Sequence, residues 1–437
     1  MENNDREKRV EQTDHDRDVL LQKDPDNRGT SSLSSASFNF INSIIGSGII
    51  GLPYSMSQAG LPLGLLLLIL VAFITDYSII LLVRGGNLSG TQSYQTLVQS
   101  TFGLTGYFIL SGLQFMYPFI AMISYNIITG DTLTKVFMRI QGVGPEDILT
   151  QRHFVILMTT ILFTTPLSLY RDIAKLGKVS LLSMLLTATI LIMVIVRAAT
   201  LGPQIPPSDD AWVFARWNGV QAVAVMSFGE TLLVFQCVQR ALVVSAVFAA
   251  AGYATFTGYT QGDIFENYCR NDNLATFGRF CYGVSIITTF PLECFVTREV
   301  VSNIFFKEEL SNTAHIIVTM VIISAGTVIS LCYDCLGIVL VLNGVLSATP
   351  LIFIFPSACF LKLSTGSWFR GENLIPSIIL VAGVCIMIIG VIMMALFPQD
   401  CSHGAEMFYC TVSNGSVLST TSSFLKIMNA TQNISLF

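Results

Sequence analysis

The chain contains a series of apolar segments that are each about as long as a lipid bilayer is thick. A helix needs about 20 apolar residues to cross the hydrocarbon core, and eleven segments of the 437 residues fit that requirement. Only 12% of the residues are charged, against about 25% in soluble domains. The sequence therefore predicts an all-α, polytopic membrane protein. The expected spans are residues 34–56, 61–83, 102–128, 154–170, 178–199, 219–238, 241–260, 277–302, 315–333, 335–361 and 375–397.

The spans divide the chain into three regions. Residues 1–33 are polar, and we expect them to form a disordered cytoplasmic tail without a cleavable signal peptide. Residues 34–397 form the membrane bundle, which must hold the function. Residues 398–437 form a polar tail that follows the last span.

The distribution of basic residues predicts the orientation, because cytoplasmic loops hold the excess of Lys and Arg. Placing the N-terminus in the cytoplasm puts fifteen of the 23 basic residues on that side. An odd number of spans then places the C-terminal tail outside or in a lumen, in the plasma or an endolysosomal membrane. That tail carries three N-glycosylation sequons, at Asn414, Asn429 and Asn433.

Three cysteines lie outside the predicted spans, at positions 269, 401 and 410. In an oxidising compartment, Cys401 and Cys410 are close enough along the chain to form a disulfide across a short loop. The open alternative is that they stay unpaired.

The first span is interrupted at its centre by Gly46, Ser47 and Gly48, with Gly51 and Pro53 close behind. At membrane depth, unpaired backbone groups are tolerated only where they face protein, water or a ligand. Broken spans of this kind bind substrate and coupling ion in secondary transporters. The open alternative is a glycine-lined seam for helix packing.

Two further polar groups point to cation binding. Thr289 lies just before a proline of the eighth span, and Asn42 in the first span offers an amide oxygen. Hard cations prefer oxygen ligands, although a threonine in a helix also bonds back to its own turn. Glu293, in the same span as Thr289, is a candidate either for bonding within the bundle or for a role in transport.

No catalytic signature is present, so we expect the protein not to be an enzyme. The string G-S-G-I-I-G at 46–51 matches a dinucleotide fingerprint, but it lies inside a span rather than between a strand and a helix. We expect no cofactor and no nucleic-acid partner.

Several long segments resemble one transporter family. FNFINSIIGSGIIGLPYSMSQAG resembles the first helix of the sodium-coupled neutral amino acid transporters, in the amino acid/auxin permease group. The segments TFTGYTQGDIFENYC and FGRFCYGVSIITTFPLECFVTREV are also similar to members of this family. The resemblance covers nearly all of residues 34–410.

The resemblance implies an eleven-helix bundle, with two inverted five-helix repeats, broken helices 1 and 6, and one extra helix. It implies sodium-coupled symport by alternating access, with a small neutral amino acid, sodium and the lipid bilayer as partners. By the same resemblance, Asn42 and Thr289 coordinate sodium. The substrate-binding residues that it implies are Gly46, Ser47, Gly48 and Ser227.

One stretch departs from the family pattern. The region of helices 6 and 7, at residues 229–252, is shortened, so residues 219–260 barely hold two spans with about two residues between them. The alternative function is therefore a transport-inactive or sensor variant.

Overall fold

The computed structural model describes residues 48–144, 146–171, 177–208, 210–216, 218–229, 235–306, 310–368, 370–396 and 406–413. Every element in these ranges is a helix or helical turn. Asn42, Gly46, Ser47, Cys401 and the three sequon asparagines lie outside the described residues.

The helices follow one another with short connections. They are α3 (Leu52–Ala59), α4 (Leu61–Ser89), α5 (Tyr94–Phe137), α6 (Arg152–Thr159), α7 (Thr165–Ser168), α8 (Gly177–Thr200), α9 (Gly219–Gly229), α10 (Phe235–Phe256), α11 (Ile264–Asn267), α12 (Asn273–Phe305), α13 (Asn312–Cys332), α14 (Leu336–Asn343), α15 (Phe355–Leu363) and α16 (Leu374–Leu396). Between these helices lie 3₁₀ turns, which include η1 (Gly48–Gly51), η6 (Thr257–Tyr259) and η10 (Phe408–Ser413), and the π-turns η3 (Thr160–Thr164), η7 (Gly344–Ala348) and η8 (Pro350–Ile354).

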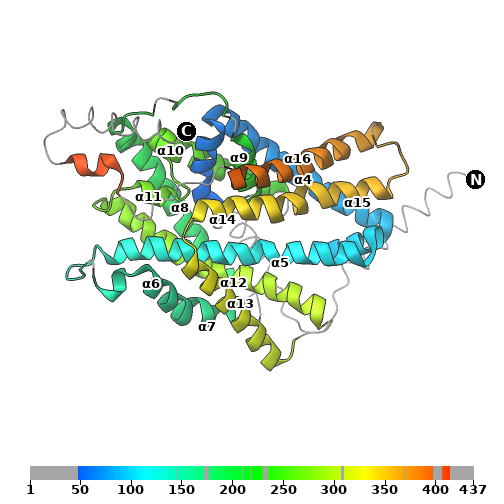
Figure 1. Cartoon of the computed structure of the whole chain (residues 1–437), viewed down its shortest axis with the longest axis horizontal. Helices are drawn as coiled ribbons and strands as arrows, with labels where there is room; N and C mark the ends of the chain where they lie inside the picture. The colour runs from blue at the N-terminus through cyan, green and yellow to red at the C-terminus, as the bar shows by residue number, and fades with distance from the viewer. Residues whose placement is uncertain are drawn as a thin grey trace, which may run out of the picture.

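Helix α5, which is broken at Gly103, runs through the whole bundle (Figure 1). In Figure 1, α4, α14, α15 and α16 lie on one side of it and α6, α7 and α13 on the other. The end of the molecule that carries α11 is on the left, and the end where α5 begins at Ser93 is on the right. We refer to these as the α11 end and the Ser93 end.

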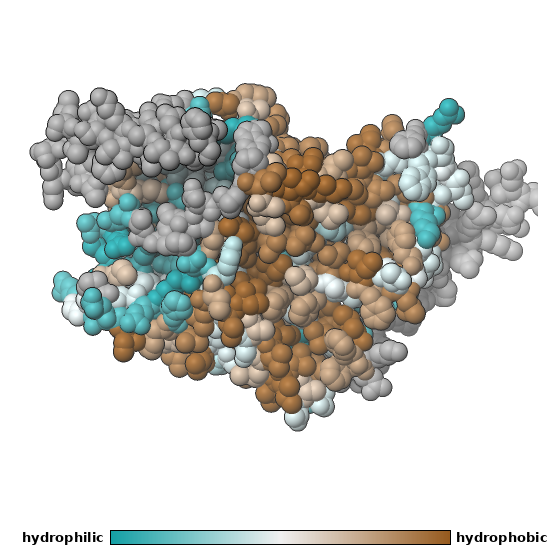
Figure 2. Space-filling model, in the orientation of Figure 1, coloured by the Kyte–Doolittle hydropathy of each residue, from teal (hydrophilic) through white to brown (hydrophobic). Residues whose placement is uncertain are grey.

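Eight helices in the described part of the chain are long and apolar enough to cross a bilayer, and each coincides with a predicted span. The remaining predicted spans, 34–56, 154–170 and 219–238, are not among these eight, and the first and last of them are described only in part, so the count of eleven crossings stays a prediction. Large apolar side chains such as Phe73 and Ile161 are exposed on the helices. The apolar surface covers the middle of the bundle and the polar surface gathers at the α11 end (Figure 2). A membrane bundle is therefore confirmed.

The sixth predicted span, 219–238, is described only in part. Helix α9 is described from Gly219 to Gly229 and α10 from Phe235 onward, and residues 230–234 lie outside the described part of the chain. The predicted end of this span at residue 238 therefore stays a prediction. Glu230 lies outside the described residues.

Two buried side chains cap the C-terminal end of α7. The Arg298 guanidinium on α12 donates to the carbonyls of Ser168 and Tyr170, with N–O distances of 2.9 and 3.4 Å. The Nε2 atom of His315 on α13 lies 3.1 Å from the carbonyl of Leu169. The last carbonyls of a helix have no partner within the helix, so these contacts satisfy them and join α7 to α12 and α13.

Two helical segments approach each other closely where η7 meets α9. A Cβ atom added to Gly344 would overlap the carbonyl oxygen of Ala224. The obstacle is backbone, which cannot rotate away as a side chain can. Only glycine allows this approach.

We predict that Gly344→Ala lowers thermal stability, because overpacking at a fixed backbone costs about 1–3 kcal/mol. Gly112→Ala in α5 is the matched control, since a Cβ there meets nothing within 4 Å. Thermal unfolding of the purified protein in detergent measures both. An unchanged melting temperature for Gly344→Ala would contradict the close approach.

Candidate functional site

The turn η1 is the first described part of the interrupted span. Its four residues, Gly48–Gly51, are all buried and form a 3₁₀ turn rather than an α-helix, which starts at Leu52. The turn lies against α9, α10, α11 and α14. The hydroxyl of Ser55 donates to the carbonyl of Gly51 at 3.1 Å. Irregular backbone is therefore present in the described part of the first span, and it is enclosed by protein.

Ser227 lies on the helix that faces this turn. It is fully buried on α9, and its hydroxyl donates to the carbonyl of Val223 at 2.8 Å. Because η1 packs against α9, the structure brings together the elements that carry Gly48 and Ser227. Both residues belong to the set that the family resemblance implies for substrate binding.

Thr289 lies in a cluster of buried hydroxyl groups between α8 and α12. Its hydroxyl donates to the carbonyl of Ser285 at 2.8 Å and lies 3.2 Å from the hydroxyl of Ser183. The hydroxyls of Ser183 and Ser285 are 2.6 Å apart. Thr187 lies 3.4 Å from Ser285 at the edge of the cluster. The back-bond expected of a helical threonine is thus present together with a contact to a second helix.

Sequence reasoning missed Ser183, Ser285 and Thr187. Each of the two helices carries a pair four residues apart, 183 with 187 and 285 with 289. That spacing puts both members of a pair on one helix face, so pairs of hydroxyl residues at i and i+4 in apolar spans were an available signal. The sequence did not reveal which two faces meet.

A cavity of about 430 Å³ reaches from the Ser93 end towards the middle of the bundle. It is lined by α4, α5, α12, η8 and α15, and its polar lining includes Ser78, Gln95, Gln114, Tyr117, Glu293 and Glu299. Glu293 is 5% exposed and lies one helical turn after Thr289. The lining residues include no Lys, Arg or His in the part of the chain that is described.

The predicted disulfide between Cys401 and Cys410 is wrong. Cys410 is bonded to Cys269, 141 residues earlier in the chain. The hydroxyl of Tyr409 also donates to the carbonyl of Asn267 at 2.7 Å. The fold brings η10 against the connection between α11 and α12, and this long-range approach, not the short loop, decides the pairing.

Comparison with protein families gives one match that spans most of the chain. A family model described as "Transmembrane amino acid transporter protein" matches residues 29–232 and 230–396. The two matched pieces meet between α9 and α10, where the sequence departs from the pattern.

Several curated relatives are similar over nearly their full length. A Danio rerio protein named "Putative sodium-coupled neutral amino acid transporter 11" is 73% identical over 440 residues, covering 96% of this chain and 98% of that protein. The Homo sapiens protein of the same name is 54% identical over 405 residues, covering 87% and 100%. "Vacuolar amino acid transporter 2" of Saccharomyces cerevisiae is 28% identical over 432 residues, covering 90% and 88%.

Solved transporter structures share the fold. A mutant of the Eremococcus coleocola manganese transporter aligns with a TM-score of 0.52 and 12% identity, covering 87% of this chain and 91% of that one. The structure of MhsT in complex with L-phenylalanine aligns with a TM-score of 0.50 and 12% identity, covering 82% and 99%.

We predict that digestion without reduction yields a linked peptide pair containing Cys269 and Cys410, detectable by mass spectrometry. The pair should persist in a Cys401→Ser variant, because Cys401 takes no part in it. Recovery of a peptide linking Cys401 to Cys410 would contradict the structure.

Proposed function

Since this chain belongs to the transmembrane amino acid transporter family, we propose that it carries small neutral amino acids across a membrane together with sodium ions. The relatives named above supply the class of solute and ion. The protein is not an enzyme and is a multi-pass integral membrane protein.

The observation that carries the proposal is the buried turn η1. An ordinary span would be continuous α-helix, whereas Gly48–Gly51 is a 3₁₀ turn enclosed by four other elements. Backbone groups released from a helix at such a turn are available to a zwitterionic solute. We assign the solute's polar groups to Gly46, Ser47 and Gly48, with Ser227 on the facing helix.

We assign the sodium ion to Asn42 and Thr289, next to the hydroxyl cluster of α8 and α12. Sodium is a hard cation, and hydroxyl, amide and carbonyl oxygens suit it without a full negative charge. The buried hydroxyls of Ser183 and Ser285 support this assignment, because they place further oxygen ligands beside Thr289. Entry of one sodium ion down 100 mV contributes about 2.3 kcal/mol to solute uptake.

Alternating access is consistent with the different character of the two ends. At the α11 end, α11 packs against η1, whereas at the Ser93 end a cavity of about 430 Å³ extends to Glu293. A transporter that opens to one side at a time has this asymmetry in one of its states. We infer that the Ser93 end is the more open of the two ends in this structure.

We propose that the α11 end faces the extracellular space or an organelle lumen, and that the N-terminus is cytoplasmic. The Cys269–Cys410 disulfide favours an oxidising compartment on that side. The membrane is the plasma or an endolysosomal membrane, residues 1–33 form a cytoplasmic tail, and residues 398–437 form a glycosylated tail on the other side.

We predict that Asn42→Ala and Thr289→Ala each raise the sodium concentration for half-maximal uptake roughly five- to tenfold, since losing one oxygen ligand costs about 1 kcal/mol. Thr288→Ala is the matched control. Its hydroxyl donates to the same Ser285 carbonyl at 2.8 Å, and we assign it no part in the ion site. Uptake of a radiolabelled neutral amino acid into proteoliposomes measures this.

Wild-type sodium dependence in both variants would refute the ion site. Binding of the amino acid without flux by the intact chain would instead favour a sensor or transport-inactive protein.

We also predict that Asn414, Asn429 and Asn433 carry N-linked glycans. Enzymatic deglycosylation should increase the gel mobility of the protein from eukaryotic cells, and a variant with glutamine at all three positions should show no shift. A wild-type protein that never shifts would place this tail in the cytoplasm or leave its sequons unused, and either result contradicts the prediction.

A further inference from the structure

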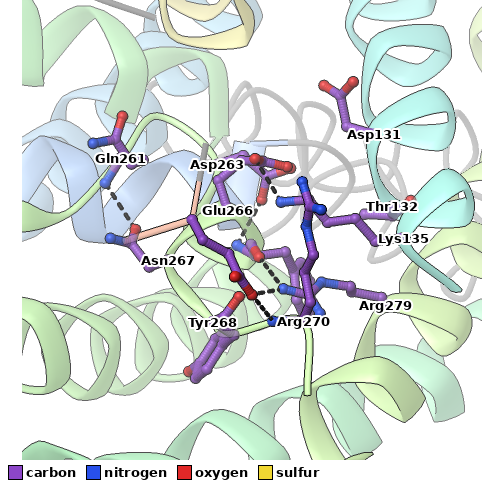
Figure 3. Close-up of polar contacts among 12 residues, drawn as sticks. Asp131, Thr132, Lys135, Gln261, Asp263, Glu266, Asn267, Tyr268, Arg270 and Arg279 are labelled. Carbon is purple, nitrogen blue, oxygen red and sulfur yellow. Dashed lines mark hydrogen bonds and ion pairs between the residues drawn. The ribbon is translucent and has the colours of Figure 1, made fainter. Parts of the chain in front are cut away.

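Buried charged side chains gather at the α11 end, where α5, α11 and α12 meet (Figure 3). Lys135 Nζ on α5 lies 2.6 Å from the Glu266 carboxylate on α11, and the two side chains are 10% and 15% exposed. Arg279 on α12 is fully buried, and its guanidinium donates to the carbonyls of Phe265 and Tyr268 at 2.7 and 2.6 Å. Helix α11 is thus attached to two helices of the bundle.

The charges on the two sides of this contact are complementary. Helix α11 and the residue that caps it contribute two carboxylates, Asp263 and Glu266. The bundle contributes the cations Lys135 and Arg279. The nearby carboxylate of Asp131 is already paired, at 2.6 Å, with the guanidinium at the start of α6. The segment of residues 262–267, called the acidic segment below, therefore docks against the cations Lys135 and Arg279.

The acidic segment covers the turn of the candidate substrate site. Ile264 and Phe265 are fully buried, and α11 lies against η1. A Cβ atom added to Gly262, just before α11, would lie 2.9 Å from the Cα of Gly337 at the start of α14. The segment is therefore inserted tightly between η1 and α14, and access to η1 from the α11 end requires it to move.

Asp263 is the least satisfied acid of this segment. It is 4% exposed, and its Oδ1 accepts a hydrogen bond from the backbone N–H of Phe265 at 2.8 Å. Its Oδ2 is buried without a hydrogen-bond partner among the described residues. A buried charged oxygen without a partner is costly, whereas the neutral acid avoids most of that cost.

The charged groups that face Asp263 do not remove the free-energy cost of burying its charged carboxylate. They are Lys135 and Asp131 from α5, Glu266 from α11 and Arg279 from α12. Asp263 lies in the connection between α10 and α12, outside the spanning helices. Burial raises the pKa of Asp263 to about 7, and the Glu266 carboxylate adds to the rise against the opposing effect of the two cations.

We propose that α11 is a lid over η1, held closed by the Lys135–Glu266 ion pair and released when Asp263 loses its proton. The lid gates the solute site of the proposed function, and in that sense it rests on that function. Its movement is a property of the protein alone and occurs without solute.

The direction of the pH effect follows from the two positions of the lid. In a raised lid the Asp263 carboxylate meets water, where an aspartate has a pKa of about 3.9. In the closed lid its pKa is about 7, so the closed position binds the proton more tightly. Acidification from pH 8 to pH 6 should therefore favour the closed lid roughly tenfold.

The test measures lid opening without transport. An Ile264→Cys reporter on α11 itself, at a site that is fully buried in the closed position, is labelled with a membrane-impermeant maleimide in proteoliposomes. The rate is divided by that of an Asp210→Cys reference on an exposed loop, which corrects for the pH dependence of the thiol. The protein without a reporter provides the background.

We expect the corrected rate to fall roughly tenfold from pH 8 to pH 6, and the Asp263→Asn variant to label slowly at both. Asparagine is nearly isosteric with aspartate and is an equally good helix cap, so this variant should fold. Lys135→Gln should raise the corrected labelling rate several-fold. The charge-swapped double variant, Lys135→Glu with Glu266→Lys, should return this rate to its value in the protein with the original ion pair. Arg139→Gln, which removes an exposed cation nearby, is the matched control and should change nothing.

The lid proposal would be overturned if the pH dependence of the labelling rate persisted in Asp263→Asn. It would also be overturned if Lys135→Gln folded but left the labelling rate unchanged. Labelling that responds as expected in a protein without uptake would reject the proposed function alone. Intact uptake with unresponsive labelling would reject the lid alone.

Discussion

Every backbone polar group within the bilayer must find its partner inside the protein, and the rest of the structure depends on this constraint. Continuous helices meet it along most of the chain. Where α7 ends inside the bundle, the buried guanidinium of Arg298 supplies the missing donors, and Arg279 does the same for α11 outside the spanning helices. The turn η1 meets the same constraint through close packing, since it is enclosed by α9, α10, α11 and α14. The backbone of the candidate site can therefore depart from regular α-helix because the surrounding helices shield it from lipid.

The membrane-spanning helices were predictable because the length of an apolar run reports directly on lipid exposure. Among the described residues, all eight helices that qualify as spans coincide with predicted segments. The same signal does not give the ends of a helix: the predicted span 102–128 corresponds to α5, which extends from Tyr94 to Phe137. Hydrophobicity reports whether a segment faces lipid and carries no information about where a helix ends beyond the lipid. The family match divides at residues 230–232, within the stretch that departs from the family pattern.

Less of the candidate site was predictable. Thr289 was identified through its place in a family motif, but its neighbours Ser183 and Ser285 depend on which faces of α8 and α12 meet. The charged contacts of Lys135 and Arg279 with α11 likewise join segments more than a hundred residues apart or on different helices. Cys410 illustrates the general limit. Proximity along the sequence favoured Cys401 as its partner, whereas proximity in space selected Cys269. Contacts set by tertiary packing leave no local signature.

The Cys269–Cys410 bond also constrains how the chain is threaded through the membrane. Two cysteines can bond only if they lie on the same side, so the chain must cross the bilayer an even number of times between them. Among the described residues of that interval, four helices are long and apolar enough to span the bilayer: α12, α13, the segment Leu336–Leu363 and the segment Gly371–Leu396. The covalent link therefore requires an even number of membrane crossings between Cys269 and Cys410, independently of hydropathy or basic residues. It also places the connection after α11 and the turn η10 in the same compartment.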